Sequence, residues 1–165
     1  MFWLILLFVI CVDYASGQLP VAWTKEYGNT LLDIAPDGDG FVVLSRSNNS
    51  GVRVEKINSA GEVNSTFDYP DFNPERICTA ENGGYCMAGV EHYPVHIVRT
   101  RFTRIGADGE ILWTRNMNTA SAVFDIVETQ QEHFVAAVSY YGLSAIKCTA
   151  PEDSASSWLR TYYEY

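Results

Sequence analysis

The sequence is short of positive charge. Its 165 residues contain 11 lysines and arginines against 20 aspartates and glutamates, which gives a formal net charge of -9. No cluster of lysine or arginine interrupts this acidic balance. An acidic surface repels phosphate backbones, so we expect no nucleic-acid partner.

Long apolar runs are also scarce. The longest, residues 2–12 with the sequence FWLILLFVICV, has eleven residues, whereas a membrane-spanning helix needs about 20. Its length is typical of the apolar core of a secretory signal peptide. Ala15 and Gly17 supply the small side chains at positions -3 and -1, which predicts cleavage after Gly17. We therefore expect a signal peptide over residues 1–17, a secreted, extracellular domain over residues 18–165 and no membrane span.

Histidine is rare, and the side chains that usually carry catalysis form no recognisable set. His92 and His96 would lie about 13 Å apart in an extended chain, at ~3.3 Å per residue. They are too far apart to share a metal ion unless Pro94 bends the loop between them. No serine lies in a G-x-S-x-G segment. We predict no catalytic residue, no metal site and no cofactor.

One acidic turn, Asp37-Gly38-Asp39-Gly40, has carboxylates at alternating positions, as calcium-binding loops do. The third acidic ligand and the distal glutamate of an EF-hand loop are missing. The sequence therefore favours a simple hairpin turn over a calcium site here.

Cysteine is sparse as well. Cys11 would leave with the signal peptide, so Cys78, Cys86 and Cys148 would remain in an oxidising compartment. Three is an odd number, so at least one of them stays free or pairs between chains. We expect Cys148 to be a buried thiol.

Cys78 and Cys86 flank one predicted hairpin, and their relation depends on the turn. A two-residue turn at Asn82-Gly83 would place the cysteines on opposite faces of the hairpin. A three-residue loop over residues 81–83, with Gly83 left-handed, would place Cys78 directly opposite Cys86. A disulfide between them and a pair of buried thiols are both open.

Secretion also gives meaning to two N-glycosylation sequons. They are Asn48-Asn49-Ser50 and Asn64-Ser65-Thr66, and neither has proline in the middle position. We predict glycosylation at Asn48 and Asn64.

The chain repeats itself with a period of about 45 residues. The segment KINSAGEV at 56–63 aligns without gaps on RIGADGEI at 104–111, an offset of 48. Three tryptophans follow the same spacing, with 90 residues between the first pair and 45 between the second: Trp23, Trp113 and Trp158. A third series, a turn between apolar strands, begins at Asp33, Arg76 and Asp125. These series predict repeats at about 18–70, 71–117 and 118–165.

Each repeat is predicted to form four short strands and no helix. In the second repeat the strands are expected at about 76–80, 84–90, 97–105 and 110–116, because Val, Ile, Tyr and Phe are frequent there and turn residues separate them. The second strand of a repeat is apolar at consecutive positions, as in residues 41–44 and 134–138. A strand that is apolar on both faces is expected to be buried on both faces.

Two segments of the second repeat resemble known repeats. The run Gly109-Glu110-Ile111-Leu112-Trp113 resembles the end of a quinoprotein-type propeller blade. The run from Glu81 to Gly89, ENGGYCMAG, resembles the glycine-rich entry of the second strand in secreted, kelch-like propeller repeats. The resemblance implies an all-β fold with three four-stranded antiparallel blades of about 45 residues, a partial β-propeller. It also implies that Trp23, Trp113 and Trp158 pack between blades, with Ser65 in the matching position of the first repeat.

Three blades are fewer than the four to eight of typical propellers. The chain could be a fragment of a longer product, could pair with a second copy into a six-blade ring, or could form an open stack or a compact sandwich. The expected function is a non-catalytic extracellular binding or scaffold module with an unidentified protein or glycan as its partner. The alternatives are a lectin-like glycan binder and part of a larger secreted propeller enzyme.

Overall fold

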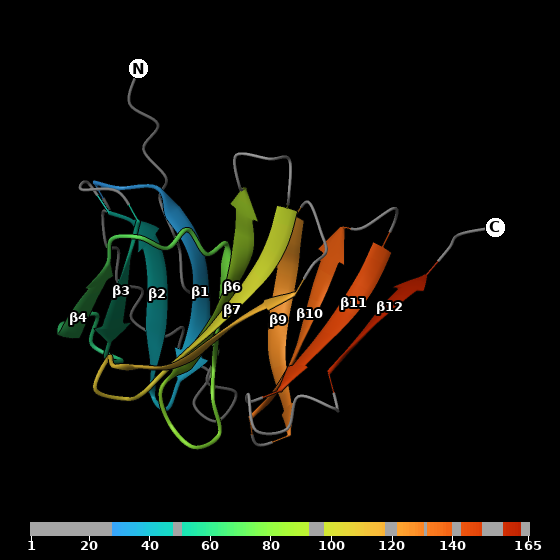
Figure 1. The fold of residues 1–165 in the computed structure, drawn as a ribbon. Helices are drawn as coiled ribbons and strands as arrows, with labels where there is room; N and C mark the ends of the chain where they lie inside the picture. The colour runs from blue at the N-terminus through green and yellow to red at the C-terminus, as the bar shows by residue number, and fades with distance from the viewer. Residues whose placement is uncertain are drawn as a thin grey trace, which may run out of the picture.

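A computed structural model of the chain describes residues 28–47, 51–92, 98–117, 122–130, 132–139, 143–149 and 157–162. This part of the chain contains twelve β-strands and no helix, so the predicted all-β class is confirmed (Figure 1). None of the described residues forms a helix long and apolar enough to cross a membrane. The predicted signal peptide, Trp23, Asn48 and His96 lie outside the described residues.

The strands form three separate four-stranded sheets, each with its strands in chain order and all neighbours antiparallel. The first sheet contains β1 (Leu31–Asp37), β2 (Gly40–Arg46), β3 (Val52–Ile57) and β4 (Val63–Tyr69). The second contains β5 (Arg76–Thr79), β6 (Tyr85–His92), β7 (Val98–Ile105) and β8 (Ile111–Met117). The third contains β9 (Ala122–Gln130), β10 (His133–Ser139), β11 (Leu143–Thr149) and β12 (Trp158–Tyr162).

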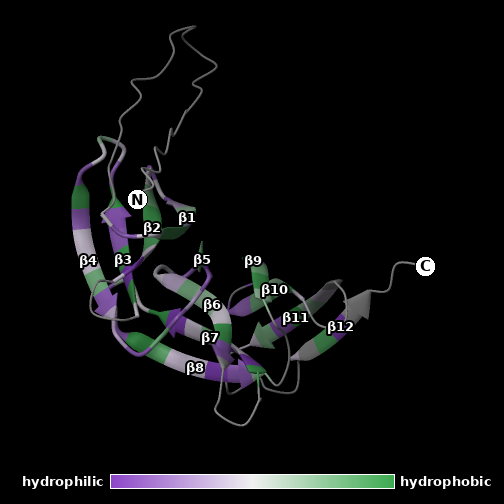
Figure 2. Cartoon of the chain, turned by 90° about the horizontal axis from the view of Figure 1, so that it is seen from above, coloured by the Kyte–Doolittle hydropathy of each residue, from purple (hydrophilic) through white to green (hydrophobic). Residues whose placement is uncertain are grey.

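The three sheets are arranged like a fan (Figure 2). The first strands of the sheets, β1, β5 and β9, lie side by side on its inner side. The fourth strands, β4, β8 and β12, lie on its outer side. The repeat in the sequence therefore corresponds to a repeat in space.

Glycine at left-handed positions fixes the hairpins inside each sheet. Gly61 and Gly109 have φ angles of 84° and 88°, which glycine adopts without steric cost. In both turns the glycine N–H bonds back to the carbonyl three residues earlier, Asn58 in one and Gly106 in the other, at 2.9 and 3.1 Å. The two aligned octapeptides of the sequence thus form the same hairpin in neighbouring sheets.

Apolar side chains fill the two spaces between consecutive sheets. The core between the first and second sheets contains Ala35, Val42, Leu44, Val52, Val54, Tyr69, Phe72, Ile77, Tyr85, Met87 and Ile105. The core between the second and third sheets contains Cys78, Ala80, Cys86, Ala88, Val90, Phe102, Val123, Ile126, Phe134, Ala136, Val138, Ile146 and Cys148. Burial of apolar surface stabilises a fold by about 25 cal/mol per Å². These two apolar layers are therefore the main source of cohesion between the sheets.

The burial of the second strands differs between sheets. Val42 and Val43 of β2 point to opposite faces and are 0% and 1% exposed, so β2 is buried on both faces, as the sequence predicts. In β10 only one face is buried: Phe134, Ala136 and Val138 are fully buried, whereas the alternating residues between them are only half-buried. The prediction of two buried faces is therefore wrong for β10, because no described sheet packs on its second face.

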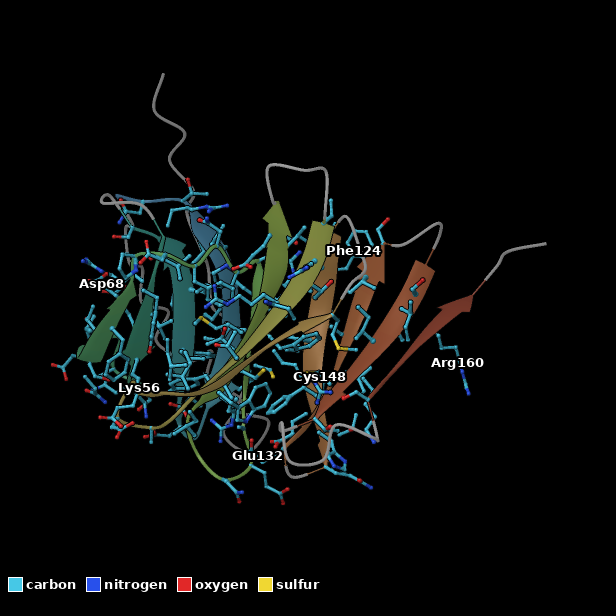
Figure 3. The ribbon with its side chains drawn as sticks, in the orientation of Figure 1. Lys56, Asp68, Phe124, Glu132, Cys148 and Arg160 are labelled. Atoms are coloured by element: carbon cyan, nitrogen blue, oxygen red, sulfur yellow. The ribbon has the colours of Figure 1, made fainter. Side chains whose placement is uncertain are left out.

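Polar contacts join the sheets near one end of the strands, where Lys56 and Glu132 lie (Figure 3). Between the first two sheets, the Tyr85 hydroxyl donates to Asp37 at 2.9 Å. Within the first sheet, Lys56 pairs with the same carboxylate at 3.1 Å. Between the second and third sheets, Arg104 pairs with Glu132 at 3.1 Å. These contacts fix the rotation of each sheet relative to the next.

Candidate binding cleft

The inner strands of all three sheets enclose one cleft, with a volume of about 480 Å³. This volume falls in the range of small-ligand sites. The lining comes from β1, β5, β9 and the start of the β5–β6 turn: Asp33, Ile34, Ala35, Pro36, Ile77, Cys78, Thr79, Ala80, Glu81, Asp125, Ile126, Val127 and Glu128.

Negative charge dominates the cleft. Four carboxylates line it, Asp33, Glu81, Asp125 and Glu128, and no lysine, arginine or histidine is found among the lining residues that belong to the described part of the chain. Apolar side chains, including the buried Ile77 and Ile126, make up much of the remaining wall. The cleft therefore combines an apolar wall with an excess of negative charge.

The surroundings of Asp33 perturb its carboxyl group. Burial raises its pKa above the ordinary value of 3.8, and the negative charge of Asp125 acts in the same direction. Hydrogen bonds from the backbone of Ile77 and Ile34, together with the positive charge of Arg76, partly offset this rise. A cation in the cleft would favour the ionised form of Asp33.

Two of the carboxylates also connect neighbouring sheets. Asp33 in the first sheet accepts a hydrogen bond from the backbone N–H of Ile77 in the second, at 2.9 Å. Glu128 in the third sheet accepts one from the backbone N–H of Glu81 in the β5–β6 turn, and another from that of Glu132 at 2.7 Å. The acidic groups thus hold the inner strands together while they face the cleft.

Cys78 contributes a buried thiol to the wall of the cleft. Burial is the main cause that raises its pKa to about 12, with the negative charge of Glu128 adding to it. Burial likewise raises the pKa of Cys148 to about 12, and that of Cys86 well above the ordinary value of 9.0. All three thiols are therefore protonated at neutral pH and are poor nucleophiles and metal ligands.

The β5–β6 turn decides the relation between Cys78 and Cys86. The Gly83 N–H donates to the Ala80 carbonyl and the Ala80 N–H to the Gly84 carbonyl, which closes the three-residue loop with Gly83 left-handed at a φ of 81°. Cys78 consequently lies directly opposite Cys86.

The predicted disulfide between these two cysteines is nevertheless absent, and both are free thiols. Hydrogen-bonded and non-hydrogen-bonded pairs alternate along an antiparallel ladder, so the bond at Ala80 and Gly84 makes Cys78 and Cys86 a hydrogen-bonded pair. Such a pair holds its Cβ atoms roughly 5 Å apart, farther than the roughly 4 Å of a disulfide.

Trp113 lies between the second and third sheets. Its ring packs against Phe134 with the ring centroids 6.0 Å apart, and its indole N–H donates to Glu132 at 3.3 Å. The side chain of Trp158 is outside the described residues. Ser65 pairs with Lys56 in the first sheet as Trp113 pairs with Arg104 in the second, so the sequence alignment of these two positions agrees with the register.

Asn64 and the residues of the acidic turn from Asp37 are not among the described residues that line the cleft. Asn64 is exposed in β4, on the outer side of the fan, where a glycan could be attached. In the acidic turn, the Asp37 carboxylate pairs with Lys56 and accepts a hydrogen bond from Tyr85 of the second sheet. This turn is therefore a hairpin whose carboxylate contacts the neighbouring sheet. Among the described residues no group of three or more histidine, cysteine, aspartate or glutamate side chains could hold a metal ion.

Sequence reasoning did not identify the acidic cleft. The turn series gave the signal that could have found it, because Asp33 and Asp125 begin equivalent segments of the repeat.

No protein-family model matches the chain. The search of curated proteins also finds no match.

Proposed function

We propose that this chain is a non-catalytic, extracellular binding module of the β-propeller type that holds a cationic group in its acidic cleft. The observation that carries this proposal is the convergence of β1, β5 and β9 on one cleft, whose described lining residues include four carboxylates and no basic side chain. The fan of four-stranded sheets supports the propeller type, and the apolar run at residues 2–12 supports secretion.

The wall of the cleft fits a lysine or arginine side chain of a partner protein. Such side chains carry an apolar stem and a charged head, and they bury the stem while the head stays paired with polar groups. Ile77 and Ile126 offer the apolar contact, and Asp33 and Glu81 offer the charge. The net charge of -9 would also speed the approach of a basic partner.

A peptide-binding experiment tests the proposal. Fluorescence anisotropy would compare a labelled oligolysine peptide with an oligoglutamate peptide of the same length. We expect only the basic peptide to bind. Asp33→Asn and Glu81→Gln should each weaken its binding about tenfold, a change of about 1.4 kcal/mol in the binding free energy.

A matched control separates the cleft from general attraction to an acidic surface. Asp71 is exposed and lies outside the strands and the cleft, so Asp71→Asn removes the same charge elsewhere. If Asp71→Asn weakens binding as much as Asp33→Asn and Glu81→Gln, the peptide senses only net charge and the cleft is not the site. Failure of the basic peptide to bind the unmodified protein would overturn the proposal directly.

A further inference from the structure

The three sheets stack by one rule, in which equivalent residues of each sheet face the next sheet in chain order. We call this the forward face. An aromatic residue at the first or second position of the second strand of each sheet aligns the three sheets. It pairs with the last residue or the last but one of the third strand: Phe41 with Ile57, Tyr85 with Ile105, and Phe134 with Cys148. Counting from these anchors identifies equivalent positions.

The apolar part of the forward face follows this register. In the first sheet it consists of Ala35, Val42, Leu44 and Val54, and in the second of Cys78, Cys86, Ala88 and Phe102, all in the inter-sheet cores. The equivalent residues of the third sheet are Val127, Val135, Ala137 and Ala145. Val127 is 53% exposed and the other three are half-buried, and none of the described sheets packs on this face.

Charged residues of the forward face follow the same rule. Asp33 accepts from the backbone of Ile77, and the equivalent Arg76 donates to the backbone carbonyl of Phe124 at 2.6 Å, so both reach the next inner strand. Their equivalent in the third sheet is Asp125, which is exposed and accepts a hydrogen bond from the N–H of the adjacent Ile126. The third sheet therefore presents a docking face of the kind that is occupied in the other two.

One row across this face is complementary to itself. The pairing registers place Asp125, Ala137, Ala145 and Arg160 side by side across β9, β10, β11 and β12. The row has an acidic residue at one end, a basic residue at the other and two alanines in the middle. A two-fold axis between the alanines would bring Asp125 of one copy opposite Arg160 of the other, and each Ala137 opposite an Ala145.

We propose that the forward face of the third sheet docks on the same face of a second copy of this chain, which forms a two-fold dimer. The small side chains of Ala137 and Ala145 allow two sheets to approach to the usual ~10 Å. Two Asp125–Arg160 contacts between the copies fix the register, as charge complementarity does at interfaces. Isologous contacts of this kind are the commonest in soluble oligomers.

The alternative, a head-to-tail ring, would need the opposite face of the first sheet to be open. Val43 and Ile57 belong to that face, and they are only 1% and 2% exposed. Because that face is already covered, it is not available to the third sheet of another copy. The two-fold arrangement needs no uncovering of buried residues.

Charge reversal tests this dimer. Light scattering on a sizing column, over a concentration series, should give the full chain a mass twice that of one chain. Asp125→Arg should place arginine against Arg160 of the second copy, and Arg160→Asp should place aspartate against its Asp125, so each variant should elute as a monomer. The double variant Asp125→Arg/Arg160→Asp restores opposite charges and should dimerise again.

The control is Asp71→Arg, which changes the net charge equally at an exposed position outside the sheets and should remain dimeric. Circular dichroism would show that all variants keep their strands. A monomeric unmodified chain, or single reversals that stay dimeric, would overturn the proposal. Loss of the dimer in both single variants without recovery in the double variant would do the same. Asp125 and Val127 belong both to this face and to the cleft lining, but Arg160 does not line the cleft. The peptide test of the cleft uses Asp33 and Glu81, which lie outside the third sheet, and Arg160→Asp tests the dimer with the cleft lining unchanged, so the two proposals can fail separately.

Discussion

Arg104 of β7 and Glu132 of the β9–β10 turn form an ion pair of 3.1 Å that connects the second sheet to the third. Only 2% of the Arg104 side chain is exposed, against 27% for Glu132. The guanidinium also donates to the backbone carbonyl of Gly83 at 2.7 Å. The buried guanidinium of Arg104 therefore binds acceptors from two sheets at once.

Removal of this arginine should be costly. Arg104→Ala removes the cation that pairs with Glu132, which keeps only the Trp113 indole N–H among the side-chain donors described above, and it removes the guanidinium that donates to the carbonyl of Gly83. We expect this variant to lower the free energy of unfolding by about 3 kcal/mol. Urea denaturation would measure the change. The control is Arg53→Ala, which breaks an exposed pair with Asp68 and should cost about 0.5 kcal/mol. Equal losses in the two variants would contradict a structural role for Arg104.

Gly84 should tolerate substitution worse than Gly38, although both have positive φ angles, 74° and 62°. A Cβ atom on Gly84 would lie 2.2 Å from the carbonyl oxygen of Ile105, whereas one on Gly38 meets nothing within 4 Å. We expect Gly38→Ala to cost about 1 kcal/mol, the price of left-handed backbone alone, and Gly84→Ala to cost more. Thermal unfolding would rank the two, and the reverse order would show that the Ile105 contact is not decisive.

Asp33 should make the stability of the protein depend on pH. Because burial raises its folded-state pKa above 3.8, its ionised form is disfavoured in the folded protein. Its stabilising contribution is therefore complete below pH 3.8 and is lost as the pH rises through the folded-state pKa. Asp33→Asn keeps an acceptor for Ile77 and removes this titration. The free energy of unfolding of the variant, relative to the unmodified protein, should increase from acidic to neutral pH, and a constant difference would contradict this.

Cys78, Cys86 and Cys148 should resist alkylation in the folded protein. With pKa values of about 12 for Cys78 and Cys148, about one such thiol in ten thousand is ionised at pH 8. Iodoacetamide treatment followed by peptide mapping should find these cysteines unmodified in the native chain and modified in urea. A Cys78–Cys86 disulfide in the map, or fast labelling of the native chain, would contradict the structure.

Local features of the fold were predictable from sequence because short-range chemistry fixes them. The strands of the second repeat were expected within one or two residues of β5 to β8, since glycines with positive φ mark the turns. The sequence also predicted that the hairpin between Cys78 and Cys86 has either a two-residue or a three-residue turn. Sequence could not choose between them, because the choice depends on the hydrogen bonds that Ala80 makes with Gly83 and Gly84.

Contacts between sheets could not be predicted from the sequence. Consecutive apolar residues in β10 predicted two buried faces, but burial depends on a neighbour that the strand itself does not encode. The cleft was missed for a similar reason. Asp33 and Asp125 are more than 90 residues apart in the chain, and only the stacking of the inner strands brings them to one cavity.

Because the sheets stack in chain order, each sheet is stabilised by apolar contacts with the sheet next to it in the stack. The first and third sheets each pack on the second and share neither of the two apolar cores with each other. Loosening should therefore begin at an end of the stack and spread one sheet at a time, as in solenoid proteins. In the Asp125→Arg variant, which is expected to be monomeric and so to leave one face of the third sheet uncovered, amide protons of β11 should accordingly exchange with solvent sooner than those of β6, whose sheet has both faces covered.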